Sequence, residues 1–451
     1  MEIIRITISF LAFIFTGYLV LSLIAGGRKW TIAEGVALVM TLGPGTLGIL
    51  LFWLALSGEK PSFPLVLTAT LASLAGSIFQ VIRKKSAKFA TPKKLEPREL
   101  TVLIPAALLW ICLFVIVFAH SELMPVFDVD AFGLWGLKTK VLIHEGVSRN
   151  GYFQQLPLSY SHLDYPLMVP FISSIVYCAA YQTNDIISKL IYPYIFIAMT
   201  FLLYSSLRWK LERIQSILLM MLFLSMPALI RWTGAGIADV PLMLFYIGSV
   251  HYLVKYIKQQ DPVDLTLGLL FTLFTSFSKN EGMAIAAVNT AVFLFFNSIY
   301  PFKKEKLKNS LIFAGTLLLL MSPWLIFSRS LPHSHENYTQ RFRYFLHPEN
   351  IERVITITKI FFTAFFSAFS FTRWGLLWIL LVLSLLLNFK KVKEKHILAM
   401  WALFILHIAA YFAVFIISPW TPEFLAEMAL ERIILHAAPA ALFLTAYQIS
   451  R

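Results

Sequence analysis

The sequence predicts an all-α polytopic membrane protein with about 13 transmembrane helices. Hydrophobic residues make up 58% of the 451 residues and charged residues only 14%, whereas charged residues average roughly 25% in soluble domains. Apolar runs of about 20 residues recur along the chain, and each is long enough to cross a bilayer as a helix. Short clusters of Lys and Arg separate these runs, as the positive-inside rule describes.

The charge distribution indicates membrane lipid as a partner and argues against nucleic acid. The net charge is +14, but the basic residues are clustered between apolar runs rather than spread over one face. Such clusters lie on the cytoplasmic side, where they meet anionic head groups. We therefore expect the N-terminus outside and the C-terminus inside, with these basic segments inside: 28–29, 83–98, 208–213, 303–308 and 390–395.

The expected spans follow the apolar runs. Residues 166–181 and 354–371 are also apolar, but a crossing at either would place later basic clusters outside, and 166–181 is short for a span. Both are therefore expected to be re-entrant or interfacial helices on the outer side. The spans are expected near 3–25, 33–57, 63–83, 101–119, 186–207, 214–230, 238–257, 263–279, 282–300, 309–328, 374–389, 397–417 and 432–449.

Polar residues divide the chain into three parts. Residues 1–83 form a membrane unit of three helices with few polar residues, and 84–100 form a basic cytoplasmic linker that contains proline. Residues 101–451 form the domain in which polar residues gather repeatedly on the outer side. Loops that carry acids and bases between spanning helices are where a membrane enzyme would keep its chemistry.

The first outer loop, 120–165, begins with the pair Asp128 and Asp130. A carboxylate beside a membrane cavity is partly desolvated, which raises its pKa toward the range useful for accepting a proton. The pair could also bind a metal, or the acids could simply cap the helix that follows. Lys138 lies in the apolar stripe of that helix, where it would either snorkel as an interfacial anchor or hold the phosphate of a lipid-linked substrate.

The same loop ends at His162, Asp164 and Tyr165, followed by Pro166. Proline suits the first turn of a helix and an acid suits its N-cap, so a structural role explains Asp164 and Pro166 well. It explains His162 and Tyr165 less well.

Two further outer junctions carry charge. Asp239 stands at the start of an expected span, where helix capping is the default role. Lys279 and Glu281 separate two expected spans with almost no loop, and charges at the bilayer edge are costly unless they are paired or face water.

The last outer segments are basic or mixed in charge. Arg341 and Arg343 suit recognition of phosphate, whereas His333 and His335 lack an obvious third ligand for a metal and are expected to be solvated. Near the last span, Glu427, Glu431 and Arg432 are spaced for pairing with each other on a helix.

The order of these features resembles the membrane-embedded GT-C glycosyltransferases, in the bacterial branch related to protein O-mannosyltransferases and the lipid A aminoarabinose transferase. The similar features are the Asp128-Val129-Asp130 motif, Tyr165-Pro166-Leu167, the segment from Ala238 to Leu242, the segment from Lys279 to Gly282, and Arg432. They cover roughly residues 95–451. The helices within 1–83 stand ahead of the part that resembles the family.

The resemblance implies a GT-C-like bundle and an inverting transfer of a sugar from a polyprenyl-phosphate donor to an acceptor hydroxyl of a lipid, polysaccharide or protein. Asp128 or Asp130 would be the general base, with Asp128 favoured. Donor phosphate would be bound by Lys138, Lys279 and Arg432, and the arginines Arg341 and Arg343 are further candidates. Substrate would be oriented by polar groups from several segments, namely His162, Asp164, Tyr165, Asp239 and Glu281.

The resemblance also implies a bacterial inner-membrane location with the active site on the outer face. No cofactor is required in this branch of the family, and a divalent metal on the Asp128 and Asp130 pair is the less favoured alternative. The competing function is a lipid or sugar transporter, which would place charges near the bilayer midplane. A partner protein without catalytic activity would not need Asp128, Asp130, Lys279 and Glu281 together.

Overall fold

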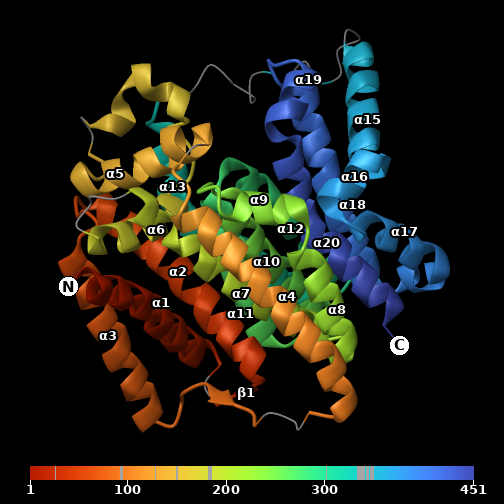
Figure 1. The fold of residues 1–451 in the computed structure, drawn as a ribbon, viewed down its shortest axis with the longest axis horizontal. Coiled ribbons are helices and arrows are strands. Elements are labelled where there is room, and N and C mark those ends of the chain that lie inside the picture. Colours follow the sequence, from red (N-terminus) through yellow and green to blue (C-terminus); the bar gives the residue numbers. More distant parts are fainter. Residues whose placement is uncertain are drawn as a thin grey trace.

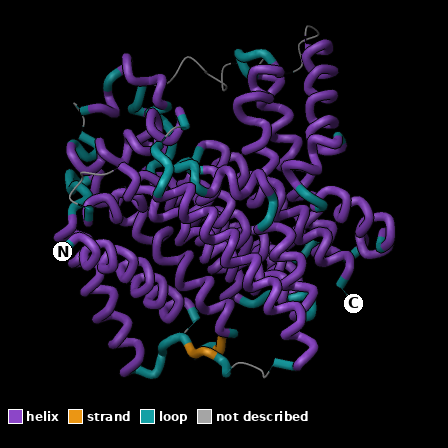
Figure 2. Tube along the Cα trace, in the orientation of Figure 1, coloured by secondary structure: helices purple, strands orange, loops and turns teal. Residues whose placement is uncertain are grey.

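The computed structural model describes residues 1–25, 27–91, 95–126, 128–148, 151–180, 185–300, 302–332, 341, 345 and 350–450. The chain forms a bundle of tilted helices (Figure 1), and strand is confined to one short pair within the described ranges (Figure 2). The strands β1 (Lys29–Trp30) and β2 (Lys88–Phe89) pair in parallel. The predicted all-α class is confirmed.

The α-helices, in chain order, are α1 (Glu2–Ile24), α2 (Ile32–Leu56), α3 (Phe63–Ile82), α4 (Pro97–Glu122), α5 (Leu137–His144), α6 (Met168–Ala179), α7 (Ile191–Arg208), α8 (Arg213–Leu224), α9 (Pro227–Thr233), α10 (Asp239–Gln259), α11 (Pro262–Ser278), α12 (Asn280–Leu294), α13 (Lys304–Arg329), α15 (Asn350–Phe366), α16 (Ala368–Trp374), α17 (Leu377–Leu387), α18 (Lys395–Ile417), α19 (Pro422–Leu425) and α20 (Glu431–Ile449). Shorter 3₁₀ or π-helical segments are η1 (Ala131–Gly136), η2 (Tyr152–Gln154), η3 (Leu156–Ser161), η4 (Asp185–Leu190), η5 (Phe295–Ile299), η7 (Phe389–Lys393) and η8 (Ala426–Leu430).

Ten helical segments among the described residues are long and apolar enough to cross a membrane. This supports a polytopic membrane protein, because each supplies roughly the 20 residues that a hydrocarbon core requires. The pair α8 and α9 makes an eleventh only if its 64° bend is counted within one span. The remaining expected spans correspond to α11 and α17, which have 17 and 11 residues. The predicted number of 13 therefore stays a prediction.

The core of the bundle is α10, whose apolar window is completely buried. It packs against α7, α11, α12, α18 and α20. By contrast only 11% of the corresponding window of α4 is buried, as expected of a helix whose surface meets lipid. Figure 1 shows α4 crossing the front of the bundle.

The short apolar helix α6 is enclosed within the protein. All 12 of its residues are buried, and it contacts α2, α5 and α7. A helix of this length spans only about 18 Å, too little to cross the hydrocarbon core. The expectation that Pro166 would occupy its first turn is wrong, because α6 begins at Met168 with Leu167 as its N-cap.

The N-terminal helices are joined closely to the rest. A Cβ added to Gly43 of α2 would lie 1.8 Å from the carbonyl oxygen of Phe13 in α1, so the two backbones touch where a side chain could not fit. The apolar window of α2 is 83% buried, and α2 also packs against α6, α7 and α11. A continuous hydrophobic core therefore joins residues 1–83 to the rest of the chain.

The two ends of the bundle differ. We call the end with β1, β2 and the C-terminus the basic end, and the end with α5, α9 and α19 the site end; they lie at the bottom and top of Figure 1. At the basic end, Arg28 binds Asp261 at 2.8 Å. Nearby, the Lys255 ammonium lies 3.2 Å from Asp264 and 3.5 Å from Glu34. These contacts join the N-terminal segment to α10 and α11.

Candidate active site

A buried network of charged side chains occupies the site end of the bundle core. Its centre is the Asp239 carboxylate, which is fully buried at the first residue of α10. The Lys279 ammonium lies 3.1 Å from Asp239 Oδ1 and 2.9 Å from the Glu281 carboxylate. His436 Nε2 lies 3.0 Å from the same Oδ1. Three segments far apart in the chain therefore meet at one carboxylate.

The guanidinium of Arg432 connects this centre to the first outer loop. One of its terminal nitrogens pairs with the Asp130 carboxylate and lies 3.8 Å from Asp239 Oδ2. Asp130 and Arg432 are 302 positions apart in the chain. We call the set Asp130, Asp239, Lys279, Glu281, Arg432 and His436 the site network.

Local backbone geometry places these residues. Asp130 directly precedes the π-helical turn η1, and Arg432 follows the π-helical turn η8; such turns are frequent at functional sites because they rotate the side chains that follow. Between α11 and α12 the backbone is extended at Lys279. A Cβ on Gly282 would lie 2.0 Å from the carbonyl oxygen of Thr275, so glycine permits the close crossing that brings Lys279 back to Asp239.

The network carries three carboxylates against two fixed cations. Buried ions need both charge partners and complete hydrogen bonding. Among the described residues, Glu281 Oε2 and Arg432 Nε are buried without a hydrogen-bond partner. Buried polar atoms left in this condition call for an explanation such as a water, an ion or a ligand. The arrangement is therefore suited to receive a further polar group.

A second layer supports Arg432 and His436. The Trp232 ring lies 5.5 Å from the Arg432 guanidinium, and its Nε1 donates to Glu431 at 2.8 Å. Tyr411 and His436 Nδ1 are hydrogen-bonded at 2.7 Å. Glu431 also forms ion pairs with two arginines, Arg231 and Arg373.

The expected pairing of Glu431 with Arg432 is wrong. Although the two are helical neighbours, Glu431 pairs with Arg231 and Arg373, whereas Arg432 pairs with Asp130 and Asp239. Adjacent residues on a helix point in different directions, and tertiary partners decide the outcome here.

Asp128 lies beside the network but outside its ion pairs. Its Oδ1 accepts hydrogen bonds from the backbone nitrogens of Asp130 at 3.0 Å and Ala131 at 3.4 Å. Burial, followed by the negative charge of Asp130, raises the pKa of Asp128, against the lowering effect of Arg432. Within the described part of the chain no cation lies within ion-pair distance of Asp128. Its carboxylate is therefore held in place, with a raised proton affinity.

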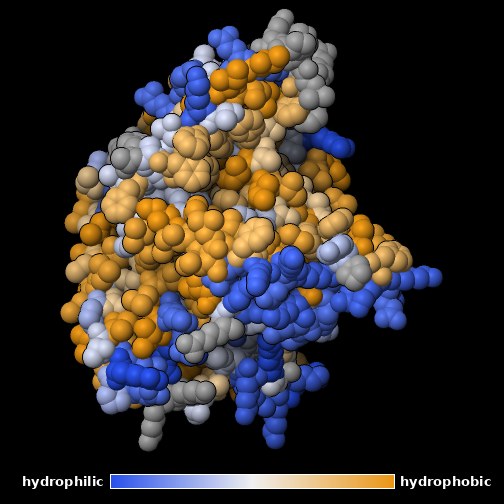
Figure 3. All heavy atoms as spheres, turned by 90° about the vertical axis from the view of Figure 1, so that its right-hand side faces the viewer, coloured by the Kyte–Doolittle hydropathy of each residue, from blue (hydrophilic) through white to orange (hydrophobic). Residues whose placement is uncertain are grey.

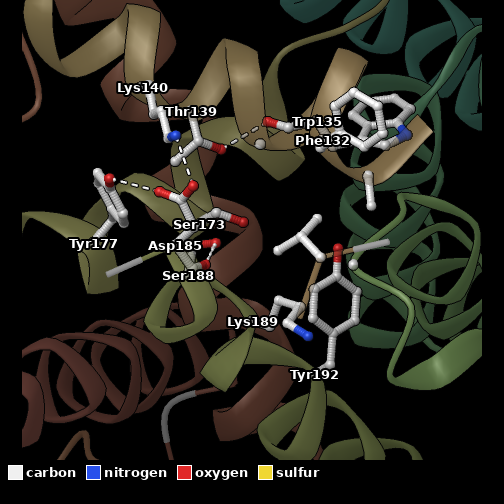
Figure 4. Close-up of a pocket in the computed structure, with 14 residues that line it drawn as sticks. Phe132, Trp135, Thr139, Lys140, Ser173, Tyr177, Asp185, Ser188, Lys189 and Tyr192 are labelled. Atoms are coloured by element: carbon white, nitrogen blue, oxygen red, sulfur yellow. Dashed lines mark hydrogen bonds and ion pairs between the residues drawn. The ribbon is translucent and has the colours of Figure 1, made fainter. Parts of the chain in front are cut away.

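Residues of the first outer loop line a pocket. Val126 and Ala131, which flank Asp128 in the chain, line this pocket of about 50 Å³, and so does Gly236, which precedes Asp239 by three residues. Figure 4 shows Lys140, Tyr177 and Asp185 together on one side, with Trp135 and Tyr192 across from them. The remaining lining residues are Phe132, Gly136, Thr139, Ser173, Ser188 and Lys189.

The polar wall of this pocket offers both donors and acceptors. Lys140 Nζ donates to Asp185 Oδ2 at 2.7 Å, and the Tyr177 hydroxyl donates to Asp185 Oδ1 at 3.0 Å. Lys189 Nζ donates to the Met124 carbonyl at 2.8 Å. Aromatic rings on one side and mixed polar groups on the other suit a ligand rich in hydroxyl groups.

Lys138 does not lie at the site network. Its side chain is fully buried, its Nζ donates to the carbonyl of His162 at 2.5 Å, and it lies 5.7 and 5.4 Å from the Trp135 and Tyr165 rings. Burial lowers the pKa of Lys138 to about 7, while the charge of Asp164 acts in the opposite direction. The expectation that Lys138 snorkels to the membrane surface is wrong, because its side chain is buried, whereas a role in binding phosphate stays a prediction.

His162, Asp164 and Tyr165 belong to the surroundings of Lys138. The His162 backbone is left-handed, with φ 49°, and its ring stacks on Tyr165 at 4.7 Å. Asp164 interacts electrostatically with Lys138. These residues therefore support the outer loop around Lys138.

Of the two arginine candidates, the structure describes Arg341, which is separate from the network. Arg341 Nε donates to the Ile417 carbonyl at 2.7 Å, which satisfies the C-terminal end of α18. Arg343 lies outside the described residues, as do His333 and His335.

The sequence reasoning did not single out His436, Tyr411 or Trp232. A usable signal existed for His436, because it follows Arg432 by four positions and so shares its helix face. No local signal identifies Tyr411 or Trp232, which reach the network through tertiary packing.

Within the described ranges, no three His, Cys, Asp or Glu side chains are arranged to hold a metal ion. No family model, characterised protein or solved structure matches this chain.

Proposed function

We propose that the protein is an integral membrane glycosyltransferase that moves a sugar from a polyprenyl-phosphate donor to an acceptor hydroxyl. The observation that carries the proposal is the site network, because it combines two fixed cations, three carboxylates and a histidine in one buried place. A site of this kind can bind an anionic leaving group and move a proton, which are the two requirements of this reaction.

Asp128 acts as the general base in this proposal. It takes the proton of the acceptor hydroxyl, whose oxygen attacks the anomeric carbon of the donor sugar. The bond between that carbon and the phosphate oxygen breaks, and the electron pair leaves with the polyprenyl phosphate. A single displacement inverts the anomeric centre. The raised pKa of Asp128 supports this role, since proton acceptance improves as the pKa approaches the working pH.

Arg432 and Lys279 bind the donor phosphate. Both are held by carboxylates in this structure, which keeps the cations paired before the donor arrives. Arg432 still has its Nε available, and a guanidinium is suited to two-point binding of phosphate. Asp130, Asp239 and Glu281 position the two cations.

The pocket lined by residues of the first outer loop admits the acceptor. Its mixed polar wall and its aromatic residues suit a hydroxylated group, and two of its lining residues, Val126 and Ala131, lie two and three positions from Asp128 in the chain. A volume of about 50 Å³ receives the reacting end of an acceptor rather than a whole chain.

We place the site end on the outer face of a bacterial cytoplasmic membrane. Arg28, Lys88 and the lysines of η7 belong to the opposite end, and the positive-inside rule assigns such an end to the cytoplasm. The donor would therefore be reached from the outer leaflet.

The test is transfer of labelled sugar from undecaprenyl-phosphate donors to envelope lipids, polysaccharides and proteins by the purified full chain in vesicles. Asp128→Asn should lower kcat about a hundredfold or more with an unchanged donor KM. Arg432→Gln should raise the donor KM as well, because it removes a phosphate ligand. Glu305→Gln, an exposed carboxylate at the start of α13, is the matched control and should retain full activity.

Full activity in Asp128→Asn would remove the proposed base. Movement of the intact donor across the vesicle membrane without any product would instead support the transporter function, and it would overturn the transferase.

A further inference from the structure

Two lysines from different helices approach each other at the basic end. Lys210 follows the end of α7, and Lys258 lies in the last turn of α10. Burial, then a hydrogen-bond contact with Lys258 and its positive charge, lower the pKa of Lys210 to about 8. The positively charged ammonium groups of Lys210 and Lys258 repel each other. Such an arrangement is unfavourable unless something compensates the charge.

A third lysine adds to the positive charge. Lys391 of η7 acts on Lys210 with the same sign, and its Nζ donates to the carbonyl of Ser450. In the described part of the chain, no carboxylate lies within 4.0 Å of the ammonium groups of these three lysines. Glu394 is the acid that influences Lys210, and its recorded partner is His396 at 3.7 Å. Among the described residues, the positive charge of these lysines is therefore left without a directly paired carboxylate.

An aromatic wall fixes the position of the pair. The Nζ atoms of Lys210 and Lys258 lie 4.6 and 6.0 Å from the Trp209 ring. That ring is held edge-to-face by His396 at 6.1 Å and by Tyr447 at 5.3 Å. Because His396 and Tyr447 are buried, the wall belongs to the packed bundle, and the lysines project from a fixed base.

The surroundings are those of a membrane boundary. The spanning segments Asp185–Arg208 and Asp239–Gln259 end here, and Lys395–Ile417 begins here. Leu386, Leu387 and Phe389, which precede Lys391, have 70, 79 and 65% of their surface exposed. Figure 3 shows hydrophilic side chains gathered below a broad hydrophobic band on this side of the molecule. A ligand at the lysines would thus have apolar surface beside it.

We propose that Lys210, Lys258 and Lys391 bind the phosphate head group of an anionic phospholipid of the cytoplasmic leaflet. The phosphate supplies the missing negative charge and acceptor oxygens for the converging ammonium groups. The acyl chains lie along the exposed apolar residues before Lys391. These apolar residues favour a lipid over a soluble phosphate, which would gain nothing from them. The inference is independent of glycosyl transfer.

The test is native mass spectrometry of the full chain with equal amounts of phosphatidylglycerol and phosphatidylcholine. The protein should retain phosphatidylglycerol preferentially. Lys210→Gln combined with Lys258→Gln should weaken that binding about fivefold for each charge removed. Lys304→Gln with Lys308→Gln is the matched control, because it removes the same charge from exposed positions at the same end. Lys210→Arg with Lys258→Arg should keep the lipid.

Three results would overturn the proposal. Equal retention of the two lipids by the unmodified protein would show no phosphate site for anionic lipid. Equal weakening by the test pair and the control pair would indicate diffuse attraction to the basic end. Displacement of phosphatidylglycerol by millimolar inorganic phosphate would assign the lysines to a soluble anion instead. Size-exclusion profiles that match the unmodified protein establish that the variants are folded.

Discussion

At the scale of single residues, the two acids of the first outer loop have different surroundings. Asp130 is paired with Arg432, so its charge is used to hold a cation. Among the described residues, Asp128 receives hydrogen bonds from backbone nitrogens alone; it is half-buried and has a raised pKa. Asp130 is thus a positioning residue and Asp128, two positions earlier in the chain, is the proposed base. The two side chains are chemically identical, and their different environments give them these different roles.

The pH profile of transfer should reflect this division. Because the pKa of Asp128 is raised, its carboxylate is protonated at a higher pH than an ordinary aspartate. Activity should therefore fall on the acid side at a higher pH than an unperturbed Asp would give. Asp128→Glu should keep a measurable acid limb, whereas the residual rate of Asp128→Asn should show none. A profile that is identical in all three proteins would exclude Asp128 as the titrating group.

At the scale of elements, the junction of α11 and α12 places two members of the site network. The carbonyl of Thr275 leaves no room for a side chain at position 282, so the crossing of these helices depends on glycine. Lys279 is the residue between the two helices, and it reaches Asp239 and pairs with Glu281 only because the helices approach so closely.

Gly282→Ala should therefore separate α12 from α11 and move Lys279 away from Asp239. Displacements of about 1 Å at such a site can lower the rate about a hundredfold. We expect that loss together with a lower Tm, measured by labelled-sugar transfer and thermal unfolding. Gly315→Ala in α13 is the control, since a Cβ there meets nothing within 4 Å. Unchanged activity in Gly282→Ala would show that the junction does not position the site.

The basic end offers a second test of paired elements. Lys255 and Asp264 join α10 to α11, with side chains 9 and 0% exposed. Removal of one partner from a buried ion pair costs about 3 kcal/mol, because the other charge is left uncompensated. Lys255→Met should thus lower the free energy of unfolding, and the double variant Lys255→Met with Asp264→Leu should recover much of the loss. An additive effect of the two changes would contradict the pairing.

Single residues of the site network were easier to predict from the sequence than their assembly. Asp239, Lys279, Glu281 and Arg432 could be selected from the sequence, because charges at helix ends in an apolar chain are conspicuous. Their assembly could not, since Asp130 and Arg432 are 302 positions apart in a chain of 451 residues. Lys138 was misplaced because a lysine in an apolar stripe looks the same whether it faces lipid or protein.

At the scale of the whole molecule, the N-terminal helices are part of the bundle that carries the site. The window of α2 is 83% buried, and much of its surface is covered by α6, α7 and α11. A sequence boundary placed at residue 83 by the scarcity of polar residues does not predict this packing, because hydrophobic composition is equally compatible with lipid and protein neighbours.

Deletion of residues 1–83 should consequently prevent correct assembly instead of leaving an active shorter enzyme. The deletion removes α2 and exposes the partner faces of α6 and α7, which include Phe171, whose ring lies 6.4 Å from that of Phe52, and Tyr194, whose hydroxyl donates to the Met40 carbonyl. Fluorescence-detected size-exclusion chromatography should show aggregated material for the shortened chain. A monodisperse, active product from 84–451 would identify the first helices as an independent unit.

The unequal count of charges in the site network has a thermodynamic consequence. Three carboxylates face two fixed cations, and a phosphodiester donor brings one more negative charge. Donor binding should therefore be linked to the uptake of a proton by the site network. Titration calorimetry in two buffers of different ionisation enthalpy would measure this uptake, and equal heats in both buffers would show that the donor binds without it. By linkage, a donor whose binding is coupled to proton uptake binds more tightly as the pH falls.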